Sequence, residues 1–401
     1  MRILHVVPAV SVAAGGPNNL VSLVRSLNEH GVDTTLLTNA DRHDPLDAPL
    51  NQVAVRDGVP YVFHHVWAVG GRYGLAPSMM RTLRQTIASY DLVHIHWLYS
   101  FSCVVAARAA RRVGVPFVVQ PHGSLDPHLR RKNRVVKAIY MATIGRPLMR
   151  EAAAVVFDTH EEGRLAVYAP RRREWVTPTG VDPSRFAPLP PRGTFRAAFP
   201  AVDGPFLLFL GRLSPQKGLD LLLAAFERLR RTHDDLWLVV AGPGYRGYEA
   251  DVRHLARRLG IDHRVLFTGM LPDGLKLAAL VDAELFVLPS YAENFGTVIM
   301  EALICGLPVV ISDRVNIHNE LSGAGVATVV AVAQPGLPDE RSIEAVAAGI
   351  RSALADPDLR RRIATAGPAF VEAHYTWDVI VPTLMARYED VIKASAGRTD
   401  R

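Results

Sequence analysis

Two glutamates eight residues apart follow a short apolar run in the second half of the chain. Glu293 and Glu301 belong to the stretch PSYAENFGTVIMEAL, residues 289–303, which leads from an expected strand into an expected helix. On one helix this spacing separates the carboxylates by about 12 Å of rise and about 80° of rotation. The two can therefore serve one ligand only if Glu293 lies in the loop before the helix. Otherwise they are solvated charges on a capped surface helix.

The residues between the two glutamates could bind a ligand through their backbone. If the helix begins near Thr297, the N–H groups of its first turn have no partners within the helix. Such a turn is a ready site for hydroxyl groups or an anion. The residues expected at this helix N-terminus are Asn294, Phe295, Gly296 and Thr297.

A second strand-to-helix loop carries two cations. The stretch LGRLSPQKG, residues 210–218, places Arg212 and Lys217 around a tight turn, and Gly218 allows close backbone approach. Two cations beside the positive end of a helix suit a diphosphate leaving group. Lys217 is one of only five lysines in an arginine-rich chain, which weakly favours a specific role for an ammonium group at this position. The competing interpretation is a loop with ordinary solvated charges.

Two loops in the first half of the chain are weaker candidates. Gly15 and Gly16 follow the first expected strand and could let the backbone cradle a phosphate or a sugar, although many strand-to-helix turns need glycine. His122 follows the strand predicted at residues 117–120 and could hydrogen-bond a substrate hydroxyl. A lone histidine at such a point is more often structural or solvated.

Three further motifs predict little chemistry. Residues 242–247, GPGYRG, fit the dinucleotide pattern G-x-G-x-x-G but open no first βαβ unit. The D-P-D at residues 356–358 has a spacing that some transferases use for a metal, yet its position favours a helix-start turn. His94 and His96 end an expected strand, but no third metal ligand is apparent.

The expected elements around these loops alternate between short apolar strands and helices. Continuous apolar strands separated by helices indicate parallel sheets covered on both faces. In such sheets ligands bind beyond the carboxyl ends of the strands. The expected strands are 3–8, 34–38, 92–96, 117–120, 155–157 and 175–177, then 206–210, 236–241, 265–268, 285–288 and 309–311.

A proline-rich stretch divides these strands into two sets. Residues 178–193 hold five prolines in sixteen positions, which excludes a helix or a central strand and predicts an interdomain linker. We therefore expect an α/β protein with two doubly wound, Rossmann-like domains facing across a cleft, residues 1–185 and residues 186–375.

Composition limits the class of protein. With 401 residues, of which 49% are hydrophobic and 21% charged, the chain is typical of a globular protein of two or three domains. The two cysteines are too few for a disulfide scaffold or a cysteine-based zinc module. No apolar run reaches the roughly 18–20 residues of a membrane span, and the N-terminus reads as a buried strand rather than a signal peptide. We expect a soluble, cytoplasmic protein.

The charge of the chain suggests anionic partners without choosing among them. The net charge is +6, from 45 basic and 39 acidic residues, which is compatible with phosphate, nucleic acid or anionic lipid. The segment Arg130–Arg150 is basic and apolar and has no acidic residue. A basic amphipathic helix there could lie on an anionic membrane surface. The alternatives are a solvated helix face or a phosphate-facing patch.

Together these motifs resemble glycosyltransferase family 4, the retaining nucleotide-sugar transferases of GT-B fold. The likeness is strongest over residues 206–313, where the motifs occur in the family's order. They are GRL with QKG at 211–218, AGPG at 241–244, and the E-x7-E element at 293–301 followed by CGLPVV at 305–310. The first half matches more loosely through Gly15-Gly16, His122-Gly123 and PTGVD at 178–182.

The resemblance implies a role for each matching residue. Arg212 and Lys217 would hold the donor diphosphate and neutralise it as it leaves. Glu293 would lie at the donor sugar, Glu301 would bind the nucleoside ribose, and His122 would contact the sugar near the reacting centre. The remaining residues implied to bind the nucleotide sugar are Gly15, Gly16, Gly211, Gly242, Asn294, Phe295, Gly296 and Thr297.

Three departures from the family limit the transfer of roles, and one of them is Thr179, where the family often has asparagine. The family often has glycine where Asn294 stands, which affects the contacts to sugar hydroxyls. The loop Asp158-Thr159-His160-Glu161 also differs from the family's Ser/Thr-Ser/Glu pair, and no catalytic role is assigned to it.

The resemblance also implies a reaction and its partners. The family transfers a hexosyl group with retention and without an obligatory metal or cofactor, here through an oxocarbenium-like state stabilised by the departing diphosphate. The donor would be a UDP- or GDP-sugar. The acceptor would be a glycan or a lipid-linked sugar in cell-surface polysaccharide assembly at the inner membrane face, and no nucleic acid is expected. A C-terminal helix at about 376–395 would pack back on the first domain.

Three other functions remain open at this point. The chain could be a related GT-B enzyme that epimerises or hydrolyses a nucleotide sugar, or a protein that binds one without catalysis. It could also be an NAD-dependent oxidoreductase that uses residues 242–247. The donor base and the identity of the acceptor are not predictable from these residues.

Overall fold

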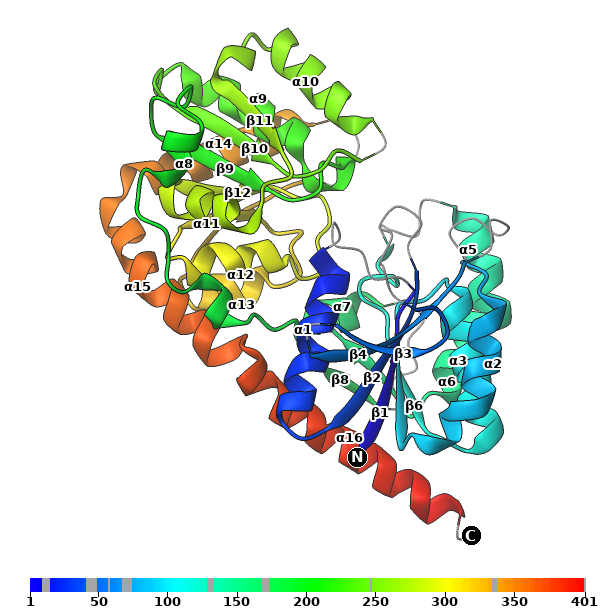
Figure 1. Cartoon of the computed structure of the whole chain (residues 1–401). Helices are drawn as coiled ribbons and strands as arrows, with labels where there is room; N and C mark the ends of the chain where they lie inside the picture. Colours follow the sequence, from blue (N-terminus) through cyan, green and yellow to red (C-terminus); the bar gives the residue numbers. More distant parts are fainter. Residues whose placement is uncertain are drawn as a thin grey trace. The chain divides into compact units, whose positions relative to one another are not determined.

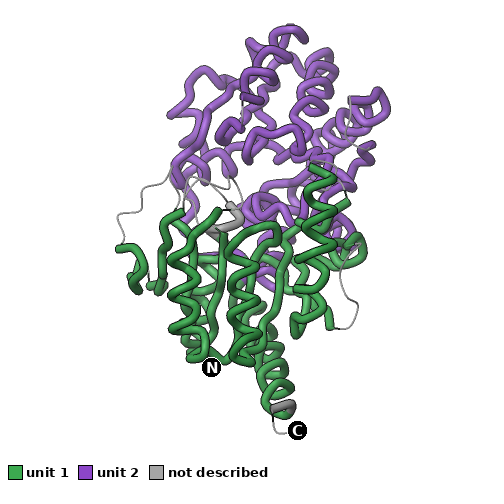
Figure 2. The backbone as a smooth tube through the Cα atoms, turned by 90° about the vertical axis from the view of Figure 1, so that its right-hand side faces the viewer, with its two compact units in different colours: residues 1–180, 377–401 green, residues 181–376 purple. Residues whose placement is uncertain are grey.

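The computed structural model describes residues 1–8, 15–40, 49–56, 58–66, 74–127, 133–166, 173–245, 247–333 and 338–399. The chain forms two compact units, drawn in green and purple in Figure 2. Unit 1 comprises Met1–Gly180 and Trp377–Arg401, and unit 2 comprises Val181–Thr376. The division at Gly180 falls inside the proline-rich stretch. Among the described residues, no helix is both long and apolar enough to cross a bilayer.

Unit 1 is built on an eight-stranded sheet (Figure 1). Its order is β3-β4-β2-β1-β5-β6-β7-β8, and every neighbouring pair is parallel except the antiparallel pair β3–β4. The neighbours β1 and β5 are far apart in the sequence, so the strand order reverses between them. The strands are β1 (Arg2–Val6), β2 (Asp33–Asn39), β3 (Val53–Arg56), β4 (Val59–His64), β5 (Leu92–His96), β6 (Phe117–Gln120), β7 (Ala154–Phe157) and β8 (Glu174–Val176).

Helices cover both faces of this sheet, whose central strands β1 and β5 are buried on both sides apart from the first residue of β1. One face packs against α2 (Pro77–Thr86) and α3 (Phe101–Val113). The other packs against α1 (Gly15–Glu29) and α16 (Trp377–Thr399), whose Val381, Leu384 and Tyr388 are buried in that core. The other α-helices in the described part of unit 1 are α5 (Arg134–Tyr140), α6 (Arg146–Glu151) and α7 (His160–Leu165), with a π-helical turn at Met141–Gly145 between α5 and α6.

Unit 2 is a six-stranded, wholly parallel sheet with the order β11-β10-β9-β12-β13-β14. Counted within the unit, this is the 3-2-1-4-5-6 order of a doubly wound nucleotide-binding fold. Its strands are β9 (Phe206–Leu210), β10 (Trp237–Ala241), β11 (Val265–Gly269), β12 (Leu285–Leu288), β13 (Val309–Ser312) and β14 (Ala327–Val330). β9 and β12, the two strands at the reversal of order, are buried at every position.

The helices of unit 2 alternate with its strands, as the sequence predicted. They are α8 (Thr194–Ala198), α9 (Leu219–Arg230), α10 (Tyr248–Arg258), α11 (Asp273–Asp282), α12 (Thr297–Ile304), α13 (His318–Gly323), α14 (Glu340–Ala355) and α15 (Pro357–His374). Asp356 caps the start of α15 by accepting a hydrogen bond from the Leu359 backbone N–H. The D-P-D motif is therefore the helix-start turn that its position favoured.

In each unit the reversal of strand order creates a crevice at the carboxyl ends of the two central strands, because the crossover helices leave in opposite directions there. In unit 1 these strands are β1 and β5, and in unit 2 they are β9 and β12. The loops singled out in the sequence follow these strands or their immediate neighbours.

Candidate active site

The loops after β9 and β12 of unit 2 pack directly on each other. The Tyr291 backbone N–H donates to the carbonyl oxygen of Gln216 over 2.8 Å. Gly218, at φ +68°, has no room for a side chain, since a Cβ there would lie 2.0 Å from the Pro289 carbonyl oxygen. The sequence therefore needs glycine at 218 for this close approach, which brings the cationic loop and the glutamate loop together.

Lys217 and Glu293 form an ion pair between these two loops. The Lys217 ammonium donates to Glu293 Oε2, and the two side chains are only 18% and 15% exposed. Glu293 lies in the loop, as required for the two glutamates to serve one ligand. Its backbone is fixed there, because its N–H donates to Arg314 O over 3.0 Å and its carbonyl accepts from Asn316 N over 2.9 Å. A partly buried ion pair on fixed loops is a preorganised charge site.

Glu301 also has a lysine partner, which sequence reasoning missed. Glu301 is the fifth residue of α12, and its Oε2 lies 3.1 Å from the Nζ of Lys276 in α11. Both side chains are 18% exposed. In the sequence Lys276 looks like an ordinary charge on a helix surface, and only the packing of α11 in unit 2 reveals its partner. The ion pair limits the rotamers that the Glu301 carboxylate can adopt.

The N-terminus of α12 offers backbone donors, as predicted. Gly296 precedes the helix in the left-handed conformation, with φ +72°, and no side chain caps the helix. Phe295 is buried, and the Asn294 side-chain oxygen accepts from the Asn316 amide over 3.2 Å. The start of α12 therefore has no side-chain cap, and the Ile299 N–H donates to the Gly296 carbonyl oxygen over 2.8 Å.

Arg212 and the loop glycines complete the unit 2 site. The Arg212 guanidinium is exposed and lies over the Tyr245 ring, 4.7 Å from its centroid, a cation–π arrangement. Gly211 and Gly242 lie so close that a Cβ on Gly242 would meet the Gly211 carbonyl oxygen at 2.0 Å. Gly242, the first glycine of the G-x-G-x-x-G stretch, thus serves the packing of the β9 and β10 loops.

In unit 1, His122 is held by a carboxylate that sequence reasoning left without a role. His122 Nδ1 lies 3.0 Å from Asp158 Oδ1 and 3.1 Å from Oδ2. The Gln120 amide also donates to Asp158 Oδ1, over 2.6 Å. Asp158 follows β7 as His122 follows β6, and β6 and β7 are neighbours in the sheet. Asp158 could have been identified in the sequence as an acidic residue directly after the strand next to β6.

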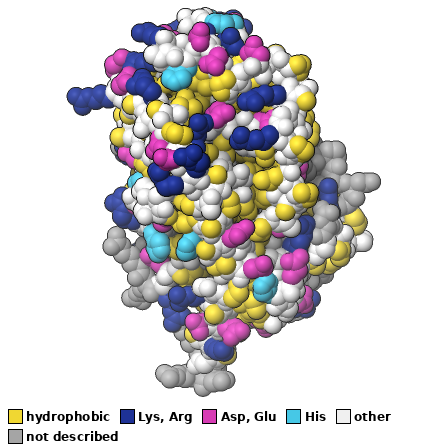
Figure 3. All heavy atoms as spheres, turned by 90° about the vertical axis from the view of Figure 1, so that its left-hand side faces the viewer, with side chains coloured by type: hydrophobic (Ala, Val, Ile, Leu, Met, Phe, Trp, Pro, Cys, Tyr) yellow, Lys and Arg dark blue, Asp and Glu magenta, His cyan; other side chains and the backbone are white. Residues whose placement is uncertain are grey.

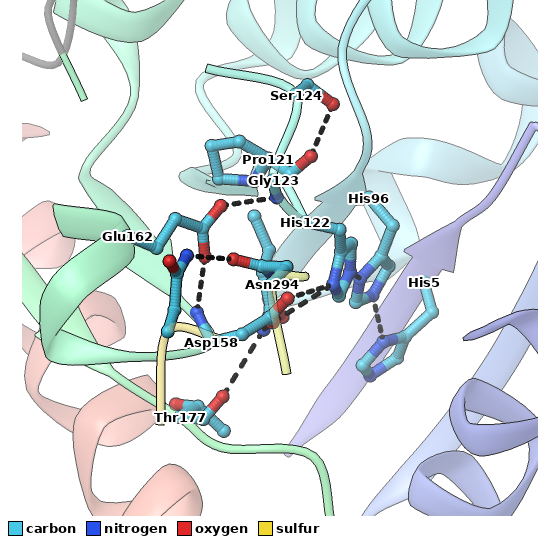
Figure 4. Close-up of polar contacts among 12 residues, drawn as sticks. His5, His96, Pro121, His122, Gly123, Ser124, Asp158, Glu162, Thr177 and Asn294 are labelled. Atoms are coloured by element: carbon cyan, nitrogen blue, oxygen red, sulfur yellow. Dashed lines mark hydrogen bonds and ion pairs between the residues drawn. The ribbon is translucent and has the colours of Figure 1, made fainter. Parts of the chain in front are cut away.

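The His122 loop is also fixed through its backbone. Glu162 accepts from the backbone N–H groups of both Gly123 and Asp158, over 2.5 Å and 2.8 Å (Figure 4). His122 itself has a φ of +50°, a left-handed conformation that is costly for a residue with a side chain. Strained backbone held by buried hydrogen bonds is common at functional sites.

The third histidine absent from the sequence prediction is present in the structure. His5 of β1 lies opposite His94 in the register of β1 with β5, and His94 and His96 face the same side of the sheet. The three histidines are fully buried, and one ring nitrogen from each lies within 4.8 Å of the other two. No third ligand was apparent beside His94 and His96 in the sequence, because the adjacency of β1 and β5 that brings His5 to them is a property of topology rather than of spacing.

Two predicted regions are described only in part. The structure begins α1 at Gly15, so Gly15 and Gly16 belong to its first turn rather than to a loop before it. Residues 9–14, immediately before them, lie outside the described residues. In the basic segment Arg130–Arg150, residues 130–132 also lie outside the described residues, and the rest forms α5, the π-helical turn and α6.

Comparison with known proteins decides the family. Residues 15–190 match the family model described as "Glycosyl transferase 4-like domain", and residues 192–370 match "Glycosyl transferases group 1". The chain is 30% identical to GDP-mannose:cellobiosyl-diphosphopolyprenol alpha-mannosyltransferase of Xanthomonas campestris, over 99% of this chain and 98% of that one. The chain belongs to glycosyltransferase family 4. A D-inositol 3-phosphate glycosyltransferase of Acidothermus cellulolyticus is 29% identical, over 94% of this chain and 86% of that one.

Solved structures confirm the fold expected of this glycosyltransferase. HepE of Anabaena, solved in complex with UDP and glucose, has a TM-score of 0.76 at 19% identity, over 97% of this chain and 100% of that one. Sucrose-phosphate synthase of Thermosynechococcus elongatus has a TM-score of 0.72 at 20% identity, over 98% of this chain and 99% of that one. The glycosyltransferase is therefore a GT-B protein with two Rossmann-like domains, and an NAD-dependent oxidoreductase is not supported.

Proposed function

We propose that this glycosyltransferase moves a hexosyl group from a UDP- or GDP-sugar to a glycan or lipid-linked acceptor, with retention and without a metal ion. The observation that carries the proposal is the Lys217–Glu293 ion pair between the β9 and β12 loops, beside the uncapped start of α12. The Xanthomonas relative is named for GDP-mannose and for a polyprenol-linked sugar, and HepE was solved with UDP. Both names support a nucleoside diphosphate donor, and the first supports a lipid-linked acceptor in polysaccharide assembly.

In this proposal each charged group of the site has one task. Lys217 and Arg212 bind the diphosphate and stabilise the negative charge that grows as the glycosidic bond breaks. Glu293 accepts hydrogen bonds from the donor sugar, and Glu301, held by Lys276, accepts them from the ribose. His122 contacts the transferred sugar. The acceptor hydroxyl attacks the face that the diphosphate leaves, which gives retention.

The pairing of the two glutamates supports a reaction without a metal ion. A divalent cation at a nucleotide sugar is usually held by carboxylates. Here Glu293 and Glu301 each face a lysine ammonium group, which opposes the binding of a cation at the same oxygens. The charge of the leaving diphosphate would then be met by side-chain cations, so we expect full activity in excess EDTA.

Retention can be tested without knowing the acceptor. Enzymes of this kind should transfer the sugar slowly to water, and the anomer first released reports the stereochemistry. With an α-linked donor, ¹H NMR within the first minutes should show the α-anomer of the free sugar. Initial release of the β-anomer would contradict retention, and a donor inverted at C2 without any acceptor would show an epimerase instead.

A surface on α5 supports contact with an anionic membrane. No residue of α5 is buried, and Val135, Val136 and Ile139 are 71%, 69% and 59% exposed. Arg134 in α5 is also exposed, so apolar and basic groups occur together on one short helix. On the face drawn in Figure 3, by contrast, basic and acidic side chains are interspersed. Exposed aliphatic side chains beside cations suit the interface of an anionic bilayer, where a lipid-linked acceptor would lie.

We expect the protein to co-sediment with vesicles of phosphatidylglycerol and phosphatidylcholine at low salt. Replacing Val135, Val136 and Ile139 together by Ser should reduce the bound fraction several-fold, because it removes the apolar area that enters the interface. The control is the double change Val53→Ser with Val55→Ser, at valines 65% and 70% exposed on β3. Equal binding of both variants, or no binding of the wild type, would contradict membrane contact through α5.

A further inference from the structure

A chain of hydrogen-bonded imidazoles runs from His122 into the core of unit 1. His122 Nε2 lies 2.9 Å from His96 Nδ1, and His96 Nε2 lies 3.0 Å from His5 Nδ1. Figure 4 shows the three rings in sequence, with Asp158 at the outer end. His5 and His96 are fully buried, whereas the His122 side chain is 14% exposed. The exposed member of the chain is therefore the one at the candidate site.

The carboxylate at the outer end sets the direction of every hydrogen bond. An ionised Asp158 only accepts, so the proton of a neutral His122 must lie on Nδ1. His122 Nε2 must then accept from His96 Nδ1–H, and His96 Nε2 must accept from His5 Nδ1–H. The chain ends at His5 Nε2, a buried nitrogen with no hydrogen-bond partner among the described residues. This direction leaves a lone pair unpartnered there, which costs less than an unpartnered buried N–H.

The surroundings keep the inner rings neutral. Burial lowers the pKa of His5 to about 3, and burial with the neighbouring histidines lowers the pKa of His96 well below its ordinary value. The groups that face His96 are His5 from β1, His94 from β5 and His122 after β6. The hydroxyl of Tyr388 from α16 lies 2.6 Å from His94 Nδ1. None of these groups is an anion that would stabilise an imidazolium at His96.

We propose that His96, supported by His5, is a positioning residue that holds His122 as a neutral ring with its proton on Nδ1. The inference rests on the proposed function and adds a specific consequence to it. With both ring nitrogens occupied, His122 cannot protonate the departing diphosphate. The neutralisation of that group then falls to Arg212 and Lys217, and His122 supplies a fixed surface for the sugar.

The same histidines do not present the geometry of a metal site. His5 Nδ1 and His96 Nε2 face each other in a hydrogen bond, and the His94 and His96 rings are stacked with centroids 4.0 Å apart. Imidazole lone pairs lie in the ring plane, so two rings stacked with only 24° between their planes are poorly placed to direct lone pairs at one point between them. Binding of an ion by His5, His94 and His96 together would break the hydrogen bond between His5 and His96. The metal content of the purified protein therefore distinguishes a metal site from this chain of hydrogen-bonded imidazoles, the histidine relay.

The direct test is ¹⁵N NMR of the full-length protein labelled at its histidine rings, which needs no substrate. We expect His122 to show a protonated Nδ1 and an unprotonated Nε2 in the wild type. In His96→Leu the donor to Nε2 is lost, and the His122 signals should change toward a mixture of tautomers. In His96→Asn the side-chain amide can replace Nδ1–H, so the wild-type pattern should return. His64→Leu, at a buried histidine of β4 outside the relay, controls for an added apolar side chain.

The kcat values of the His96 variants should follow the same order as their NMR signals. We expect kcat to fall about 10- to 100-fold in His96→Leu, with a small change in the donor KM and substantial rescue in His96→Asn, since misplacing one group of a site costs about this much. A protonated Nε2 on His122 in the wild type would overturn the proposal. So would unchanged signals and kcat in His96→Leu, or stoichiometric zinc in the purified protein. If neither the wild type nor any variant turns over a donor, the proposed function fails. The NMR result then decides by itself whether His96 positions His122.

Discussion

Replacing Lys217 by Ala should lower kcat by about 100-fold or more, and replacing Arg212 by Ala should do the same. In the proposed reaction each change removes one preorganised cation from the leaving diphosphate, and the loss of one such electrostatic stabiliser typically costs about 10²- to 10³-fold. Lys217 is preorganised by its ion pair with Glu293, and Arg212 by its position over Tyr245. The measurement is steady-state turnover of a nucleotide-sugar donor with each purified variant.

Two comparisons separate this role from a general loss of charge. Lys393→Ala removes an exposed lysine paired with Glu389 in α16 and should leave kcat unchanged, because exposed ion pairs contribute little. Lys217→Arg keeps the charge but not the compact ammonium group, so only partial activity is expected. Near-wild-type kcat in both Lys217→Ala and Arg212→Ala would remove the diphosphate assignment.

The second large effect is on the acid stability of unit 1. Burial lowers the pKa of His5 to about 3 and of His64 to about 4, and lowers the pKa of His94 and His96 well below the ordinary value of 6.5. Below pH 6.5 the unfolded state therefore binds more protons than the folded state, so the free energy of unfolding decreases as pH falls. The contribution of these four histidines to stability is fully present above pH 6.5. Four such groups give a slope of up to about 5 kcal/mol per pH unit near pH 5.

The free energy of unfolding of an ordinary domain is only about 5–15 kcal/mol. A fall at this slope over two pH units would remove most or all of it. We expect the free energy of unfolding, measured by denaturant titration between pH 7.5 and 4.5, to fall steeply below pH 6.5. His64→Leu should reduce the slope by about one proton, or about 1.4 kcal/mol per pH unit, even if the variant is less stable throughout. An equal slope in wild type and His64→Leu would contradict the lowered pKa of the buried His64.

The parts of the site that lie within one strand–loop–helix segment could be predicted from the sequence. The strands at 92–96, 117–120, 206–210 and 285–288 have the predicted bounds, because continuous apolar runs define buried parallel strands. Glu293 lies in the loop before α12 because Gly296 starts the helix from a left-handed conformation. These features depend on local chemistry, which a sequence carries directly.

The partners of those residues could not be predicted, because they depend on which strands become neighbours. His5 meets His96 only because β1 pairs with β5, and Asp158 meets His122 only because β7 follows β6 in the sheet. Lys276 reaches Glu301 through the packing of α11 in unit 2. The sequence also gave no sign that a β3–β4 hairpin would extend the unit 1 sheet with an antiparallel edge.

We propose that unit 2 binds a nucleotide-sugar donor through Glu301 and the cationic loop without a metal ion. This proposal is tested most directly by calorimetric titration of UDP- and GDP-sugars into the wild type and Glu301→Ala, with and without EDTA. We predict saturable binding of one donor that EDTA does not alter and that weakens about 10- to 100-fold in Glu301→Ala, as a lost charged hydrogen bond to the ribose requires. Binding abolished by EDTA, equal affinity in Glu301→Ala, or no binding of any donor by the folded protein would contradict it.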